Sequence, residues 1–537
     1  MSESPEQATA TRDEDGEVLH GLGYQQELKR VLGLFDNFSI AFSYLSPMVG
    51  VYSLFVLGAG AAGPAYLWLM IPVVVFMLLV ALVFGELGSS FPLAGALYQY
   101  GKRTVGPGFG WWVGWIYGLA LLVTVASVDT GFIIYFAPLM KNLFNVNINA
   151  TSHGVILLAT LILIAVQTVL NSVGAKMMGH VTRIGVYVET AGTFGVAIAL
   201  GIVGFHHGLG FLFTTHGAAH AATNTLGVNF GGNWLTGAAL VAVLAHVYIF
   251  YGFESAGDVA EETRQASRMV PRAMRRALVY GGIASFVLVA ALLLAIPSSA
   301  KGYASALSFT GGVPYILAEL PSWVQDVFLV LVCVAFFSCG TAVQGAGSRL
   351  TYSYARDRAI PASGWARKVS PRFGTPINAL LVGAVVPALF VLLVNINPAH
   401  NVHILWFVFP AGINALTLLV SFGVSGIYLS FLLTVIGSMI ARARGWQPTG
   451  QFRLGRWGWP VRILAAAYLA LMLINIVYPS GLASPRGALF NFDWITLVVM
   501  ILLLLIGGIY FILARPAAPS GGMTPLDPPL SRDTTSP

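Results

Sequence analysis

Long apolar runs recur along this sequence, and they limit what the chain can fold into more than any other feature. A helix that crosses the hydrocarbon core of a bilayer needs about 20 mostly apolar residues. None of the runs alternates apolar and polar residues with a period of two, which disfavours a β-barrel. We therefore expect an all-α polytopic membrane protein with about 12 transmembrane helices, near residues 34–58, 65–87, 109–137, 153–171, 181–204, 234–257, 273–297, 322–349, 376–396, 408–440, 460–480 and 492–514.

Composition supports the same class of protein. The 537 residues are 57% hydrophobic and only 9% charged, whereas an ordinary soluble domain is about 45–50% apolar and about 25% charged. So few charges cannot cover a soluble particle of this size, which excludes a cytosolic multidomain enzyme and a disordered chain.

The placement of the basic residues predicts the orientation in the membrane. If the N-terminus is cytoplasmic and all the runs are spans, every Lys and Arg except Lys141, Lys301 and Arg486 falls in an inner segment. Positive residues concentrate in cytoplasmic loops. We therefore expect a multi-pass protein of the cytoplasmic (plasma) membrane with both termini cytoplasmic, and we read the basic balance as topology rather than nucleic-acid binding.

Two of the runs contain residues that interrupt a helix. Ser46-Pro47-Met48-Val49-Gly50 lies in the first run, and Tyr251-Gly252-Phe253-Glu254 lies in the sixth. Each alone fits an ordinary Pro kink or a packing Gly, because both residues are common in membrane helices. However, the first and sixth runs open two successive sets of five helices. Broken helices in corresponding places of two inverted repeats are the best pointer in a sequence to a transporter site.

Short motifs flank these runs in a characteristic order. They are GYQQELKR at 23–30, FGELGSSFPLAG at 84–95, GFE at 252–254, EET at 261–263 with Pro271, ARD at 355–357, Ile360-Pro361, and GTP at 374–376. With these motifs, residues 23–515 resemble the amino acid–polyamine–organocation superfamily, in its amino acid/choline permease branch.

The resemblance implies a leucine-transporter-type fold of five-plus-five inverted repeats with two added helices. It divides the chain into a tail at 1–30, repeats near 34–204 and 234–440, added helices near 460–514 within a domain of 31–515, and a tail at 516–537. It also implies an amino acid permease that takes up or exchanges a small amino compound by alternating access. Choline, a polyamine and γ-aminobutyrate are alternative substrates, and amino acid exchange is an alternative mode.

The two interruptions contain the candidate substrate-binding groups. Main-chain N–H groups around the first interruption suit a carboxylate, while carbonyls and aromatic rings around the sixth suit an amine. Asp129 in the third run is a further candidate, for pairing with a cationic amine, although it can equally lie at the outer interface. Simple packing is the alternative for each ring. The candidate substrate residues are Ser46, Met48, Val49, Gly50, Asp129, Ile249, Phe250, Tyr251 and Phe253.

Candidate coupling and gating residues are fewer. Glu189 in the fifth run is a candidate proton carrier, where many proton-coupled relatives have a Lys, and a Glu held between helices is the alternative. Glu254 is expected to tie the sixth-run interruption to neighbouring helices or gates. Ser338 and Thr341 share a helix face and can offer oxygens to Na⁺, or can bond back to their own helix. We expect Glu86, Asp258, Glu261 and Glu262 to pair with Lys102, Arg103 and the cationic residues of 264–276 at an inner gate.

Other functions lack their signatures. The sequence has no Gly-x-Ser-x-Gly or His-Glu-x-x-His motif for a membrane enzyme, no Arg-ladder helix or filter repeat for a channel, and no Walker motif for ATP hydrolysis. The His-rich segment 205–233 is too irregular for a metal site, so we predict no enzyme activity, no metal and no cofactor. We expect H⁺ rather than Na⁺ as the coupling ion of a symporter, a small amino compound and the lipid bilayer as partners, and no nucleic acid.

Overall fold

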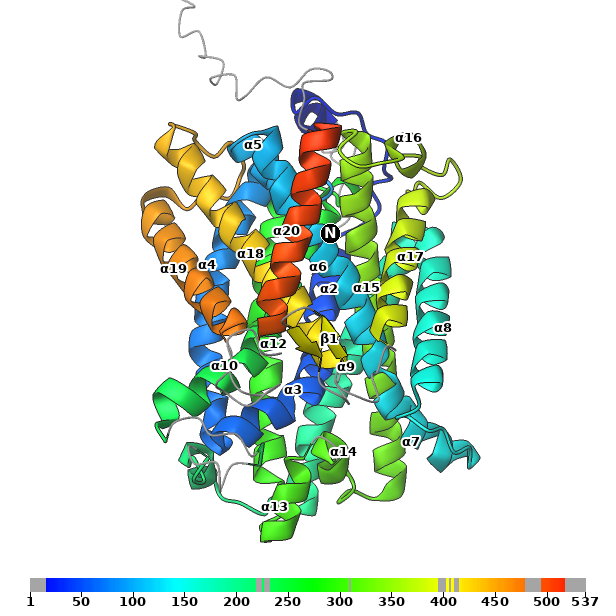
Figure 1. Cartoon of the computed structure of the whole chain (residues 1–537), viewed down its shortest axis with the longest axis vertical. Helices are drawn as coiled ribbons and strands as arrows, with labels where there is room; N and C mark the ends of the chain where they lie inside the picture. The colour runs from blue at the N-terminus through cyan, green and yellow to red at the C-terminus, as the bar shows by residue number, and fades with distance from the viewer. Residues whose placement is uncertain are drawn as a thin grey trace, which may run out of the picture.

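A bundle of long helices running roughly along one axis makes up almost all of the protein (Figure 1). The computed structural model describes residues 16–218, 225–226, 232–308, 311–394, 402–404, 407–409, 415–478 and 494–516. In this part of the chain, 10 helices are long and apolar enough to cross a membrane, and two shorter apolar helices lie at Trp234–Val247 and Ile377–Leu392. The predicted helical, polytopic architecture is confirmed.

The first half of the chain supplies the helices of the first five expected spans. The first span consists of two helices, and the second consists of a 3₁₀ turn followed by a helix. The elements are α2 (Leu34–Leu45), α3 (Pro47–Ala62), η1 (Pro64–Leu69), α4 (Met70–Ser90), α5 (Ala96–Thr104), α6 (Pro107–Gly131), α7 (Ile133–Phe144), α8 (His153–Ser172), α9 (Ala175–Val203) and η2 (Leu209–Phe213).

The second half supplies the remaining spans and short connecting helices. Its elements are η3 (Trp234–Ala238), α10 (Ala239–Val247), α11 (Ser255–Asp258), η4 (Ala260–Glu262), α12 (Ala266–Leu294), α13 (Ala300–Ala306), α14 (Gly312–Leu317), α15 (Ser322–Arg356), α16 (Ser363–Ala366), α17 (Ile377–Val394), β1 (Val402–Ile404), β2 (Phe407–Phe409), α18 (Ala415–Ala443), η5 (Gly455–Trp457), α19 (Gly458–Val477) and α20 (Ile495–Ala514).

One predicted boundary is wrong. The tenth run was expected to be helical from residue 408, but 407–409 form β2, which pairs antiparallel with β1, and α18 begins at Ala415. Here β-branched and aromatic residues dominate a short apolar stretch, and such a stretch looks the same in a buried helix and in a strand. The predicted limits of the repeats and tails remain predictions.

The first span is broken at Ser46. This residue has a left-handed backbone (φ 39°) and separates α2 from α3, and Pro47 is the first residue of α3. Proline suits that position, because it has no N–H and its fixed φ matches a helix start. The Ser46 hydroxyl accepts from Val49 N–H at 3.3 Å and caps the new helix.

The sixth span is broken between α10 and α11. Residues 248–254 lie outside α-helix, and Gly252 has φ 100°, which side-chain-bearing residues rarely adopt. The two breaks lie against each other. A Cβ on Gly50 would lie 2.7 Å from the Ile249 side chain, and one on Gly252 would lie 2.8 Å from Leu45 N. Glycine at both positions lets the two interrupted backbones approach.

Helices of the two halves pack in interchangeable pairs. α4 packs against α12, α6 against α18, and α9 against α15. In the two sets of five spans, α4 corresponds to α12, α6 to α15, and α9 to α18. Exchanging the sets therefore turns the α6–α18 pair into the α15–α9 pair and leaves the α4–α12 pair unchanged. This is the packing that two five-helix sets related by a two-fold axis produce.

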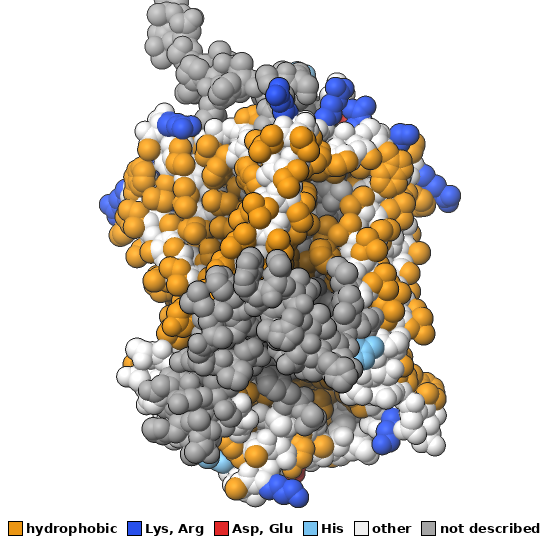
Figure 2. Space-filling view, viewed as in Figure 1, with side chains coloured by type: hydrophobic (Ala, Val, Ile, Leu, Met, Phe, Trp, Pro, Cys, Tyr) orange, Lys and Arg blue, Asp and Glu red, His pale blue; other side chains and the backbone are white. Residues whose placement is uncertain are grey.

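The surface separates into an apolar belt and a basic end. Figure 2 shows hydrophobic side chains covering much of the bundle's side, while most Lys and Arg side chains in view gather at the upper end, where Figure 1 places α5 and α16. We call this the basic end. Large apolar side chains such as Ile202, Ile512 and Leu513 are more than two-thirds exposed, which is expected of a surface that faces lipid.

Candidate functional site

A buried carboxylate caps the helix that starts at the first break. Glu189 of α9 is fully buried, and its Oε2 accepts from Met48 N–H at 3.4 Å, while its Oε1 has no partner among the described residues. Val49 N–H donates to the Ser46 hydroxyl, and Gly50 N–H donates to Ser46 O at 3.0 Å. Glu189 therefore holds the N–H group that an external carboxylate would reach at the positive end of α3.

The second break has free acceptors and its own carboxylate. No described residue donates to the carbonyl oxygens of Ile249, Phe250 or Tyr251. Glu254 is fully buried, and its Oε2 accepts from Gly252 N–H at 2.8 Å. Each break thus combines a buried glutamate that binds one main-chain N–H with main-chain groups suited to a charged ligand. The predicted grouping of the two interrupted segments is present in the fold.

The aromatic candidates divide into two groups. Tyr251 meets Tyr44 of α2 edge to face, with ring centroids 5.8 Å apart, so these rings lie between the breaks. Phe253 instead packs on Phe84 and Phe431, at centroid distances of 6.0 and 5.7 Å. Its contacts are those of a packed core residue, whereas Tyr251 is only partly buried.

Asp129 lies among other helices. Its Oδ1 accepts from Gln167 Nε2 of α8 at 2.7 Å, and a Cβ on Gly340 of α15 would collide with the same oxygen. Asp129 is buried, and its Oδ2 has no partner among the described residues. The structure therefore places Asp129 at the contact of α6, α8 and α15, and none of its described hydrogen bonds reaches a residue of either break.

Ser338 and Thr341 of α15 bond in different ways. Ser338 Oγ donates to Ser43 Oγ of α2 at 3.1 Å, and Ser43 Oγ donates to Thr182 O. Thr341 Oγ1 donates to Phe337 O of its own helix at 2.8 Å. Only Ser338 thus reaches the first span. Among the described residues, no group of three His, Cys, Asp or Glu side chains is arranged to hold a metal ion.

An ion-pair network lies at the basic end, in the segment that follows the second break. Glu262 binds Arg349 through two hydrogen bonds of 2.9 and 3.0 Å, and Glu261 binds Arg356 through two of 2.8 and 2.9 Å. The chain before α2 crosses this region, because Leu32 N–H donates to Glu262 O at 2.9 Å. Both arginines are on α15, so the network ties α15 to the segment after α11.

A second part of the network lies around Asp357. Lys102 is 2.5 Å from Asp357, and Tyr24 and Tyr98 both donate to the same carboxylate. Burial alone would raise the pKa of Asp357, but the charges of Lys102 and Arg356 outweigh burial and hold that pKa below its ordinary value. Asp357 is therefore ionised at neutral pH and attracts the cations around it.

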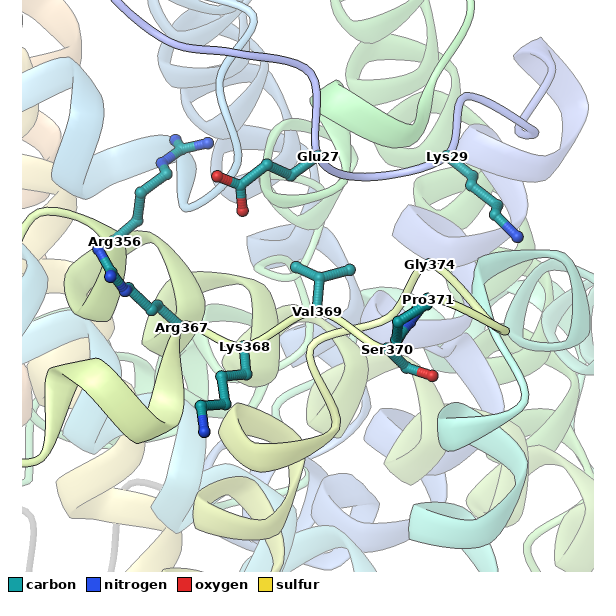
Figure 3. Close-up of a pocket in the computed structure, with 9 residues that line it drawn as sticks. All are labelled: Glu27, Lys29, Arg356, Arg367, Lys368, Val369, Ser370, Pro371 and Gly374. Carbon is teal, nitrogen blue, oxygen red and sulfur yellow. The ribbon is translucent and has the colours of Figure 1, made fainter.

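A pocket of about 660 Å³ opens beside this network at the basic end (Figure 3). Glu27 and Lys29 line it from the chain before α2, and residues 367–371 with Gly374 line the side facing them. Its lining includes Arg356 of the network but no residue of either break. The pocket therefore belongs to the surface of the basic end and not to the site between the breaks.

Known proteins with similar sequences identify the family. The family model described as amino acid permease matches residues 32–510. The chain is 27% identical to an uncharacterized amino-acid permease of Schizosaccharomyces pombe, over 92% of this chain and 85% of that protein. It is 26% identical to the amino-acid permease BAT1 of Arabidopsis thaliana (88% and 90% covered) and 24% identical to the GABA-specific permease of Saccharomyces cerevisiae (87% and 79%).

The chain belongs to the amino acid permease family. The resemblance expected from the motifs is thereby confirmed, and so are a transporter rather than an enzyme and a multi-pass membrane protein. The motif residues Glu261 and Arg356 of this permease bind each other, so two motifs separated by about 90 residues meet at the basic end.

Two features of this permease were missed or misassigned from sequence. Glu86, Glu261 and Glu262 do pair with cations, but these are Arg442 and Arg462 for Glu86, Arg356 for Glu261 and Arg349 for Glu262, not Lys102, Arg103 or the cations of 264–276. Asp258 is fully buried and binds Tyr117 at 2.8 Å, and no described cation pairs with it. The sequence feature that could have indicated this environment is the position of Asp258 four residues after Glu254, because that spacing places both carboxylates on one helix face. Nothing in the sequence pointed to Gln167 as the partner of Asp129.

The Arg349–Glu262 pair is expected to stabilise the closed basic end. Replacing Arg349 with Gln leaves Glu262 buried without its cation, and removing one partner of a buried pair costs about 3–5 kcal/mol. We expect Arg349→Gln to lower the thermal unfolding temperature of detergent-purified protein measured by tryptophan fluorescence. The matched control is Arg358→Gln at an exposed position, and equal stability of the two variants would contradict the assignment.

Proposed function

We propose that this permease is a secondary active transporter that moves an amino acid or related amino compound across the cytoplasmic membrane by proton-coupled alternating access. The observation that carries the proposal is the pair of facing breaks. At one break Glu189 holds Met48 N–H at a helix start, where a substrate carboxylate can take its place, and the other break presents the free carbonyls of Ile249, Phe250 and Tyr251. An α-amino acid has one group for each, a carboxylate and an ammonium.

Glu189 supplies the coupling in this proposal. Its carboxylate occupies Met48 N–H, which is the donor that the substrate carboxylate needs. Two carboxylates cannot share one donor at close range, because like charges repel strongly in a dry site. A proton on Glu189 removes its charge and weakens its hold on the helix start. Proton and substrate therefore bind together, which is the condition for symport.

The basic end faces the cytoplasm in this proposal. Positive residues concentrate on the cytoplasmic side of membrane proteins, and the chain before α2 lies at this end with Tyr24 and Leu32 bound to it. Opening towards the cytoplasm requires separation of the two Arg–Glu pairs, since they join α15 to the segment after α11. The ion-pair network is thus the inner gate, and substrate is released when it opens.

Amines without a carboxylate form the alternative substrate class. Choline or a polyamine would use the free carbonyls and the Tyr251 ring but would have no use for Met48 N–H. γ-Aminobutyrate has both charged groups at a wider spacing, and exchange of one amino compound for another would not require a proton. The position of Glu189 at the helix start favours a substrate that carries a carboxylate.

Uptake into proteoliposomes tests the function directly. We expect radiolabelled amino acids or γ-aminobutyrate to accumulate under an imposed proton gradient, and choline and polyamines to accumulate less. Parallel assays with a sodium gradient and with preloaded substrate distinguish ion symport from exchange. Failure of every compound under all three conditions would remove the transporter proposal.

Glu189→Gln tests the coupling. Like a protonated glutamate, the introduced glutamine carries no charge. We therefore expect substrate binding to persist while proton-driven accumulation is lost. Binding is measured by the rise in thermal stability with added substrate, and accumulation by the uptake assay at several external pH values. The control is Glu319→Gln, an exposed acid. An unaltered pH dependence in Glu189→Gln would refute the coupling role.

Asp129→Asn tests whether Asp129 selects cationic side chains. If Asp129 pairs with a substrate cation, its loss removes a charge-assisted hydrogen bond and raises KM for cationic substrates about 10- to 100-fold, with little change for neutral ones. An equal loss of uptake for cationic and neutral substrates would instead assign Asp129 to the contact with Gln167.

A further inference from the structure

Four acidic residues lie within one short segment after the second break, and they fall into two kinds. Glu261 and Glu262 each bind an arginine through two hydrogen bonds. Glu254 and Asp258 are equally buried, but no cation bonds to either of them within the described part of the chain. The gate assignment therefore explains the first two acids and leaves the second two without a role.

Glu254 and Asp258 share one donor. The Tyr117 hydroxyl of α6 lies 2.8 Å from Asp258 Oδ2 and 3.3 Å from Glu254 Oε1. Gly252 N–H binds Glu254 Oε2 at 2.8 Å, and Asp258 Oδ1 has no partner among the described residues. The four carboxylate oxygens thus receive three neutral donors, which are the Tyr117 hydroxyl and the main-chain N–H groups of Gly252 and of Glu254 itself. The single hydroxyl proton of Tyr117 can serve only one carboxylate at a time.

Two negative charges cannot be maintained under these conditions. A buried, unpaired ion costs several kcal/mol, and a second like charge beside it adds repulsion. Paired carboxylates in such sites relieve both costs by sharing one proton. We propose that Glu254 and Asp258 form a proton-binding site, held by Tyr117, which carries one proton while the basic end is closed.

The groups that face the pair are neutral or already paired. α2 contributes Tyr44 and α5 contributes Tyr100, and both hydroxyls are buried without a partner among the described residues. α12 places Met274 beside Gly257, and Arg349 of α15 is bound to Glu262 rather than to the pair. The unpartnered hydroxyls are an independent sign of an incomplete polar site, because buried donors normally have acceptors.

The position of the site connects the second break with the gate. Glu254 binds the main chain of the break at Gly252, and Glu261 and Glu262 of the network follow Asp258 by three and four residues. When the network separates and water enters, the cost of ionising the pair falls and the proton leaves towards the basic end. This direction of release rests on the proposed function, whereas the presence of the proton does not.

Infrared spectroscopy of the purified full-length protein tests the site without transport. A protonated carboxyl group has a carbonyl band that carboxylates lack and that shifts in D₂O. We expect Asp258→Asn to lose the band of one protonated carboxyl, because the introduced side-chain amide can then donate to Glu254, which keeps Tyr117 and Gly252 and ionises. The double variant Glu254→Gln/Asp258→Asn should lose the same amount, and Glu319→Gln should lose none.

Other outcomes would overturn the proposal. No loss in the double variant would mean that both carboxylates are ionised, and loss of two carboxyl bands would mean that each holds its own proton. Tyr117→Phe is a milder variant, expected to shift the band to higher frequency at unchanged intensity because one hydrogen bond is removed. An unshifted band in this variant would show that Tyr117 does not hold the proton site.

A transport assay then separates this proposal from the proposed function. For any substrate that is transported, we expect the rate of exchange by the Asp258→Asn variant to lose its dependence on the pH at the basic end. Its dependence on the pH at the opposite end should remain. If no substrate moves, the proposed function fails, and the infrared result still decides the proton site.

Discussion

The main constraint on this structure is that interrupted backbone inside a membrane must find hydrogen-bond partners within the protein. Water is absent there, and each unsatisfied N–H or carbonyl costs several kcal/mol. The permease meets this constraint with two buried glutamates, Glu189 at Met48 N–H and Glu254 at Gly252 N–H. The carbonyls of residues 249–251 are left without described donors. The glutamates thus stabilise main-chain N–H groups at both breaks, and the carbonyls of the second break remain available to a ligand.

Charge is distributed in this protein according to the cost of burying it. Arginines pair with Glu261 and Glu262 beside the basic end of the bundle. Deeper in the bundle, Glu189, Glu254 and Asp258 have no bound cation in the described structure and only neutral donors. The acids thus change from paired to unpaired between the basic end and the two breaks.

Much of the fold could be predicted from the sequence, because apolar length and helix-breaking residues act locally. Pro47 removes a donor and Gly252 permits a positive φ, so both interruptions were visible locally, and their corresponding places in the first and sixth runs distinguished them from an ordinary kink or packing glycine. The start of the tenth span was not, because a short apolar stretch at 407–409 has no periodicity that separates strand from helix. In the site, Glu189 and Glu254 were found as acids at membrane depth, but which N–H group each one caps was not encoded in any local pattern.

The sequence by itself determined that the chain spans a membrane many times, where two of its helices break and which family motifs it contains. The tertiary structure decided which acids have partners. Asp258 and Glu262 are four residues apart and look alike in sequence, yet one binds the neutral Tyr117 and the other binds Arg349. The physical reason is that the partner of a buried charge comes from a helix distant in sequence, and its protonation depends on that partner and on the exclusion of water.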